Sequence, residues 1–320
     1  MHLREGFLII VFGKREKGGL SMFGVKNHIR ESLGDKVFMV IIYTVLMIAL
    51  LIVLLPLIYI VSASFSSPSA VTGGRVWLWP VEFSLEGYKA TFKNSRILTG
   101  YTNSFIYTLF GTLISVTLTV LIAYPLSRKT FYGRNILMIF IVFTMIFTGG
   151  LIPTYLVVQK LGMIDTRWAM ILPQAVAVWQ VIIARTFFQT TISDDLVEAS
   201  EMDGCSDIRF LWSIVIPLSK PIIAVLVLMY AVFQWNAYFD ALIYLKSADL
   251  HPLQLVLRDI IILNTSAGGQ MEASEMMRAQ ELSNLLKYCL IVVASLPVLI
   301  IYPFVQKHFV KGVMIGSLKG

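Results

Sequence analysis

The sequence predicts an all-α integral membrane protein. Of its 320 residues, 57% are hydrophobic and only 14% are charged, and the mean hydropathy is +0.77. One or two soluble cores would not bury so much apolar surface. Six long apolar runs separate the polar segments, and a helix needs about 20 such residues to cross the bilayer core. We therefore expect six transmembrane helices.

The six expected spans follow one another along the chain. They cover residues 37–61, 104–126, 136–158, 169–183, 214–239 and 288–305. The fourth run is short, so its helix is expected to continue through Arg185 toward Phe188. Prolines lie in or beside these runs, and in a membrane neighbouring helices can satisfy the carbonyls that prolines leave free. The glycine pair and proline in residues 148–155 predict a kink or an unwound turn in the third span.

The distribution of basic residues indicates the orientation. Lys and Arg are frequent before the first span, after the last span, and in the short loop that contains Arg128, Lys129 and Arg134. Short basic loops stay on the cytoplasmic side of a membrane. Both termini are therefore expected in the cytoplasm, with residues 1–36 as a cytoplasmic extension and residues 37–320 as the six-span domain.

Two features of the outer loops carry expectations of their own. Trp77 and Trp79 fit either an aromatic belt at the membrane surface or local packing, and both interpretations stay open. In the last outer loop, Leu253, Val256 and Leu257 begin a helical spacing of apolar residues. We expect a helix there that lies on the outer surface against lipid or a partner.

Several classes of function are disfavoured. The net charge of +7 does not indicate a nucleic-acid partner, because excess Lys and Arg belong at the membrane flanks of so apolar a chain. Cys205 and Cys289 are not paired and the four His are scattered, so no metal site is expected. No H-E-x-x-H, no G-x-S-x-G and no acid pair lies in a span, so no catalytic residue and no enzyme activity are expected. The phosphate loop G-x-x-x-x-G-K-[ST] is absent from the sequence, so ATP is not expected on this chain.

The predicted cytoplasmic loop between the fourth and fifth spans, residues 189–213, has a definite local structure. Ser193 is suited to cap a helix whose first turn carries two aspartates. Gly204 suits the left-handed position at which such a helix ends, and Ser206 suits the cap of a second short helix that carries Phe210 toward the membrane. On form alone, a rigid docking element and an ordinary surface loop are equally open.

The residue spacing in this loop resembles the EAA motif of the permease subunits of bacterial ABC importers. In that motif glutamate and two alanines are followed at fixed intervals by glycine, isoleucine and proline, and Ser200 here replaces the second alanine. Asp203 and Pro221 resemble the sugar-transporting, maltose-type branch. The resemblance implies that residues 193–213 couple the chain to an ATPase. The residues expected to do so are Glu198, Ala199, Ser200, Asp203, Gly204, Phe210 and Pro217.

The resemblance extends over nearly the whole chain beyond the N-terminal extension. The stretches "SFSSPSAV", "AYPLSRK", "GGLIPTYLVVQKLGMIDTRWAMILP", "WNAYFDALIYL" and "FVKGVMIGSLKG" resemble the LplC/YtcP group of carbohydrate permeases. It implies the type I ABC importer permease fold, a multi-pass place in the bacterial cell membrane, and translocation of a sugar or oligosaccharide. It also implies a heterodimer with a second permease, two ATPase subunits that hold ATP and Mg, and an extracellular sugar-binding protein.

An ion-coupled secondary transporter of a small polar solute is the alternative. Such transporters usually place an acid or a histidine inside the membrane. The expected spans contain none, apart from Lys220 near the cytoplasmic end of the fifth span, and Asp240 follows that span at its outer end. This scarcity of coupling groups favours the ATP-driven class.

A polar and aromatic cluster near the outer end of the fifth span is the candidate solute path. Its residues are Tyr230, Gln234, Trp235, Asn236 and Tyr238. Tyr230, Gln234 and Tyr238 are spaced to share one helix face. Sugars favour aromatic faces beside polar groups, but the same residues also serve as hydrogen-bonding contacts between helices, so both interpretations stay open.

Overall fold

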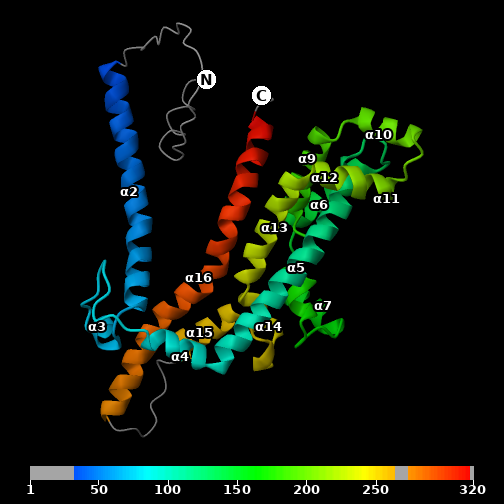
Figure 1. Cartoon of the computed structure of the whole chain (residues 1–320). Coiled ribbons are helices and arrows are strands. Elements are labelled where there is room, and N and C mark those ends of the chain that lie inside the picture. Colours follow the sequence, from blue (N-terminus) through cyan, green and yellow to red (C-terminus); the bar gives the residue numbers. More distant parts are fainter. Residues whose placement is uncertain (1–31, 264–272, 318–320) are drawn as a thin grey trace. The chain divides into compact units, whose positions relative to one another are not determined.

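The computed structural model describes residues 32–263 and 273–317, and within them every regular element is helical (Figure 1). The chain divides into two compact units, residues 1–53 and 54–320. The expected N-terminal extension lies almost wholly outside the described residues. The first unit contains the N-terminal part of α2 (Leu33–Ser64), which includes most of the first expected span.

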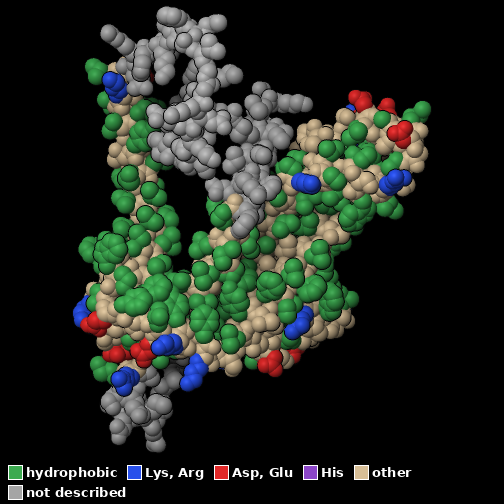
Figure 2. Space-filling view, in the orientation of Figure 1, with side chains coloured by type: hydrophobic (Ala, Val, Ile, Leu, Met, Phe, Trp, Pro, Cys, Tyr) green, Lys and Arg blue, Asp and Glu red, His purple; other side chains and the backbone are tan. Residues whose placement is uncertain are grey.

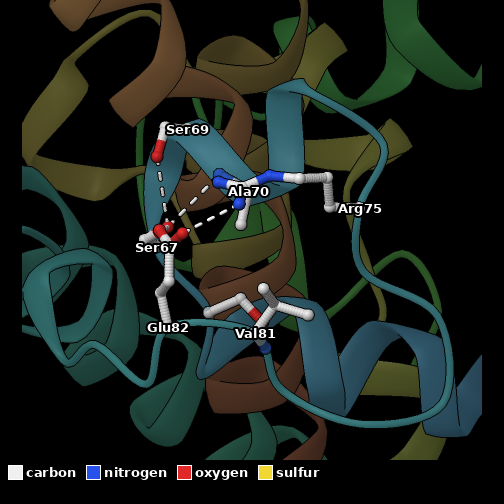
Figure 3. A network of polar contacts seen from close by, with 7 residues as sticks. Ser67, Ser69, Ala70, Arg75, Val81 and Glu82 are labelled. Carbon is white, nitrogen blue, oxygen red and sulfur yellow. Dashed lines mark hydrogen bonds and ion pairs between the residues drawn. The ribbon is translucent and has the colours of Figure 1, made fainter.

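A small lobe follows α2 in the second unit. It contains α3 (Pro68–Thr72) and α4 (Glu86–Lys93). Ser67 caps α3 and also donates a 2.6 Å hydrogen bond to Glu82, whose carboxylate accepts a second one of 2.8 Å from Arg75 (Figure 3). Ser62, just past the apolar run of α2, donates to the Leu78 carbonyl at 2.7 Å. The lobe is thus tied to the end of α2, and Trp77 and Trp79 are exposed on it.

Three helices form the centre of the second unit: α5 (Ser95–Ser127), α13 (Lys220–Trp235) and α16 (Ala273–Ser317). The largest buried cluster joins α5 and α13 to α9 (Val178–Thr191) and to the segment that precedes α13. Charged side chains gather at the two ends of this unit, and the surface between them is apolar (Figure 2). Such a surface is what lipid-facing helices require.

The helix expected in residues 253–261 exists, but its apolar face is covered by the chain itself. In α15 (Leu253–Leu263), Leu253, Val256 and Leu257 are buried against Ile97 of α5 and residues of α13 and α16. The expectation that this face meets lipid or a partner is therefore wrong. The spacing showed that one face is apolar, whereas the surface that covers it is set by residues distant in sequence.

The third expected span is not one straight helix. α6 (Arg134–Ile146) and α7 (Leu151–Lys160) are bent by 113° across residues 147–150. Gly150 has φ of +84°, a conformation that suits glycine. The unwound turn expected at residues 148–155 is present at the start of that stretch.

The fourth and fifth expected spans are also interrupted. Helix α8 (Trp168–Ile171) ends before Pro173, and the chain is not helical again until α9. Before α13, the chain forms α11 (Asp207–Phe210), a π-helical turn (Leu211–Val215) and α12 (Ile216–Leu218). This run lies at 83° to α13, so residues 214–218 do not continue the fifth span as expected. Pro217 and Pro221 both lack the amide hydrogen that a continuous helix would need near Ser219.

Three helices of the described residues are long and apolar enough to cross a membrane, and there are up to five if each bent pair forms one span. The remaining short elements are α10 (Asp194–Met202), α14 (Phe239–Tyr244) and a 3₁₀ turn (Ala248–Leu250).

Candidate functional site

The segment between α9 and α13 is a helix, a glycine turn and a second helix. Ser193 caps α10 by accepting a hydrogen bond from the Leu196 amide, and Ser206 caps α11 by accepting one from Arg209. Gly204 has φ of +71°. The expected local structure of this segment is therefore present.

The turn itself is closed by a pair of backbone hydrogen bonds. The Gly204 amide donates to the Glu201 carbonyl and the Cys205 amide donates to the Ser200 carbonyl, both at 2.9 Å. This is the Schellman arrangement that ends a helix at a left-handed residue. The two helices are consequently held at a fixed angle by main-chain contacts.

The expected coupling residues divide into exposed and buried groups. Glu198, Ala199 and Asp203 are exposed. Ser200 is buried and donates to the Val197 carbonyl at 2.7 Å, while Phe210 is 2% exposed and packs beside Tyr124. Phe210 holds the segment on the helices beneath it, Ser200 bonds within α10, and the exposed residues are available to a partner. Pro217 lies beyond them, at the bend before α13.

Large apolar side chains stand exposed on the same segment, and the sequence analysis missed them. Met202, Ile208 and Trp212 are 89%, 73% and 61% exposed. Ile208 of α11 and Trp212 of the π-helical turn that follows are four residues apart and both exposed, while Phe210 between them is buried in the core. That spacing was the available signal. Figure 2 shows acidic side chains gathered at the same end of the molecule.

Two arginines, also missed, fasten the base of the segment. The guanidinium of Arg128 donates to the carbonyls of Phe188 (3.0 Å) and Ile192 (3.2 Å), at the end of α9. Arg185 on α9 donates in turn to the Leu126 carbonyl near the end of α5 (2.9 Å). The neighbouring Lys129 forms a 2.8 Å ion pair with Asp194, the first residue of α10, and this contact holds the pKa of Asp194 below its ordinary value.

In the polar cluster of α13, two members form contacts between helices. The hydroxyl of Tyr230, which is buried, shares a 2.7 Å hydrogen bond with Thr119 of α5 and accepts one from the Ala177 amide. Trp235 donates from its ring nitrogen to the Ala294 carbonyl of α16 at 2.9 Å and packs edge-on against Tyr101. These contacts are those of residues that hold helices together.

The other three members of the cluster differ. Gln234 is 2% exposed, and neither polar atom of its side chain has a hydrogen-bond partner among the described residues. Asn236 is exposed and donates only to the Val232 carbonyl of its own helix, and Tyr238 is 45% exposed. Asn236 and Tyr238 are therefore accessible to a solute, whereas Tyr230 and Trp235 are not. Among the residues that the structure describes, no cluster of three or more His, Cys, Asp or Glu is placed to hold a metal ion.

Comparisons with known proteins cover most of the chain. Residues 115–313 match the family described as "Binding-protein-dependent transport system inner membrane component". The polygalacturonan/rhamnogalacturonan transport system permease protein YtcP of Bacillus subtilis is 42% identical over 89% of this chain and 99% of its own length. Protein LplC of the same organism is 42% identical over 84% of this chain and 90% of its own.

A solved structure is similar as well. It is a chain of a bacterial ABC transporter involved in the import of the acidic polysaccharide alginate. The two chains are 35% identical, with a TM-score of 0.81, and the match covers 87% of this chain and 99% of that one. The residues matched by the family include α10, α11 and α13.

Proposed function

Because the chain belongs to the family of binding-protein-dependent transport system inner membrane components, we propose that residues 193–213 are the element through which its ATPase acts on it. The chain is the permease subunit of a carbohydrate ABC importer, with the type I ABC permease fold, in the plasma membrane. It is not itself an enzyme, because the ATPase of such importers is a separate subunit. Permeases of this kind work with that ATPase and with a substrate-binding protein.

The exposed apolar face of the segment is the observation that carries the proposal. Met202, Ile208 and Trp212 stand in water if nothing covers them, and soluble surfaces rarely expose such residues together. Acidic side chains such as Glu198 are exposed on the same segment, which suits a partner surface that carries basic residues. The caps and the glycine turn keep this face rigid, so a force applied to it moves the segment as one body.

A charge reversal tests the docking. Glu198→Lys is expected to insert in the membrane normally but to lose ATPase association and solute-stimulated ATP hydrolysis in the reconstituted complex. Glu86→Lys on α4, which reverses another exposed glutamate in the lobe that follows α2, is the matched control and should keep both. Full association and stimulation in Glu198→Lys would contradict the docking role.

We further propose the complete assembly and its topology. The chain pairs with a second permease, two ATPase subunits hold ATP and Mg on the cytoplasmic side, and six spans leave both termini in the cytoplasm. The basic flanks of the first, second and last spans support this orientation. An impermeant thiol reagent should label a cysteine at Thr72 in intact cells and a native Cys205 or a cysteine at Ser206 only after the membrane is opened. Labelling at residue 206 from outside would overturn the orientation.

The solute is proposed to be an oligosaccharide that contains uronic acid. One relative is named for polygalacturonan and rhamnogalacturonan, and the similar solved structure belongs to an importer of alginate, an acidic polysaccharide. The reconstituted complex with its binding protein should take up a galacturonate trimer and not a neutral glucose trimer. Equal uptake of the neutral trimer would contradict the acidic class while leaving the carbohydrate permease intact.

A further inference from the structure

Arg128 is a buried cation without an acidic partner. The residue is 7% exposed, and among the described residues no carboxylate forms a salt bridge with it. Arginine does not release its proton in proteins, so the charge must be compensated where it lies. A buried charge held this way usually fixes a specific geometry, because moving its partners would leave it unpaired.

The end of α9 supplies the compensation. Phe188 lies in the last turn of α9 and Ile192 is the residue at which that helix ends, so their carbonyls form the negative end of the helix. Ser127 accepts a third hydrogen bond from the guanidinium at 3.0 Å, and the ring of Tyr124 faces it at 5.5 Å. Because all these groups are fixed in place, Arg128 binds α9 at one position only.

Arg185 makes the reciprocal contact. It lies on α9 and donates to Leu126 in the last turn of α5. Arg128 directly follows the last residue of α5, so each of the two helices holds an arginine, within it or at its end, that binds carbonyls near the end of the other helix. We call this pair, with the carbonyls of Leu126, Phe188 and Ile192, the arginine clasp. The clasp makes α5 and α9 move together at this end.

Residues 193–213, the proposed docking segment, begin directly beside the clasp. Ile192, which Arg128 binds, is followed immediately by Ser193, the cap of α10, and Lys129 is paired with Asp194 in the first turn. At its other end the segment reaches α13 only through the 83° bend at Ser219. Phe210 adds apolar packing against Tyr124 of α5, and the contacts of Arg128 fix the start of the segment to the end of α9.

We propose that Arg128 is a positioning residue that transmits the displacement of residues 193–213 to α5 and α9 together. The inference rests on the proposed docking of the ATPase at that segment. The clasp converts a movement at the docking surface into a movement of the central helix, and without it the segment moves while α5 stays behind. Solute translocation is then separated from ATP hydrolysis.

The test is the number of solute molecules transported per ATP hydrolysed by the whole reconstituted complex. Arg128→Gln keeps a polar side chain but loses the charge and the fork of donors, and it is expected to lower that ratio about fivefold, while the ATPase still co-purifies. Arg128→Lys keeps the charge and should recover part of the ratio. Arg75→Gln, which removes an ion pair with Glu82 that is exposed on both sides and lies away from the clasp, is the control and should leave the ratio unchanged.

A distance measurement separates transmission from stability. Spin labels at Tyr132 and Asp195, which are both exposed, are introduced after Cys205→Ser and Cys289→Ala. Arg128→Gln should broaden the distribution of distances between the labels, and Arg75→Gln should not. If Arg128→Gln does not accumulate, Arg185→Gln breaks the other half of the clasp and should give the same broadening and the same lowered ratio.

The outcomes also distinguish the two proposals. Suppose that Glu198→Lys loses ATPase association, while Arg128→Gln keeps both its transport ratio and its distance distribution. That result would overturn the proposed role of the clasp alone. A lowered yield of Arg128→Gln with a normal ratio in the complexes that assemble would likewise reduce Arg128 to a structural role. Retained association in Glu198→Lys would instead contradict the docking, and the broadened distances in Arg128→Gln would still report the clasp.

Discussion

Replacing Gly204 by alanine should affect both the stability of the fold and the contact with the ATPase, and the two effects can be measured separately. Gly204 has φ of +71°, and no atom lies within 4 Å of where a Cβ would be placed. The substitution therefore causes no clash within the chain. Its cost is the left-handed backbone alone, about 1 to 2 kcal/mol for a residue with a Cβ. In a chain of this size that lowers the melting temperature by only a few degrees.

The chain contains a matched control at Gly162, which follows α7. Its φ is +68°, the space around its Cβ position is also empty, and the amides of Gly162 and Met163 close the same pair of hydrogen bonds to the Gln159 and Val158 carbonyls. Gly162→Ala should thus cost the same in stability. Only Gly204→Ala places its methyl group in the proposed docking surface.

The assay is thermal unfolding of each purified complex together with its solute-stimulated ATP hydrolysis. Both variants should melt at temperatures lowered by a similar amount, and only Gly204→Ala should lose stimulation, with Gly204→Asp losing more. Equal stimulation in the two alanine variants would refute the reasoning, because the partner would then not approach Gly204 closely.

Three further outcomes are expected. In Gly111→Ala the new Cβ would lie 2.8 Å from the buried amide of Gln234, so we expect the free energy of unfolding to fall by about 1 to 3 kcal/mol. Adding Gln234→Ala should suppress this loss, and additive effects in the double variant would contradict the contact. Asp165 accepts hydrogen bonds from the hydroxyl and amide of Ser247, and these bonds lower its pKa. The ionised Asp165 therefore stabilises the folded chain at neutral pH, and this contribution is lost as the pH falls through the lowered pKa. Thermal melting against pH should show Asp165→Asn less stable at pH 7 and equal to the unmodified chain in strong acid; a constant difference would exclude the linkage. Trp235→Ala should lower the melting temperature and leave the sugar dependence of the surviving complexes unaltered. Asn236→Ala should raise the sugar concentration that gives half-maximal transport and leave the melting temperature unaltered. The reverse pattern would exchange the roles of the two residues.

Local sequence determined the docking segment well. Ser193, Gly204 and Ser206 act on residues within three or four positions, so their capping roles follow from residue type and spacing alone. The unwound turn at Gly150 was predictable for the same reason. The helix in residues 253–261 was expected from its apolar spacing, but its burial depends on Ile97, which is more than 150 positions away.

The breaks and the clasp needed the three-dimensional structure. Prolines mark residues 173 and 217, yet a membrane helix tolerates a proline, so the sequence does not distinguish a kink from an 83° turn. In the sequence, Arg128 is indistinguishable from the other basic residues at the membrane flanks. Its acceptors are main-chain oxygens about 60 positions away, and main-chain oxygens leave no signature in the sequence.

Because Arg128 binds main-chain oxygens, its attachment to the end of α9 tolerates changes in sequence. Every residue type supplies a carbonyl, so the amino acids at Phe188 and Ile192 can differ without removing the acceptors that Arg128 uses. An exchange of residues 193–213 for the corresponding loop of a permease that serves another ATPase would leave Arg128, Phe188 and Ile192 in place, and with them the attachment at the first end of the loop. A permease built this way can acquire a new energy source through a single grafted loop, while the helices that conduct the solute remain as they are.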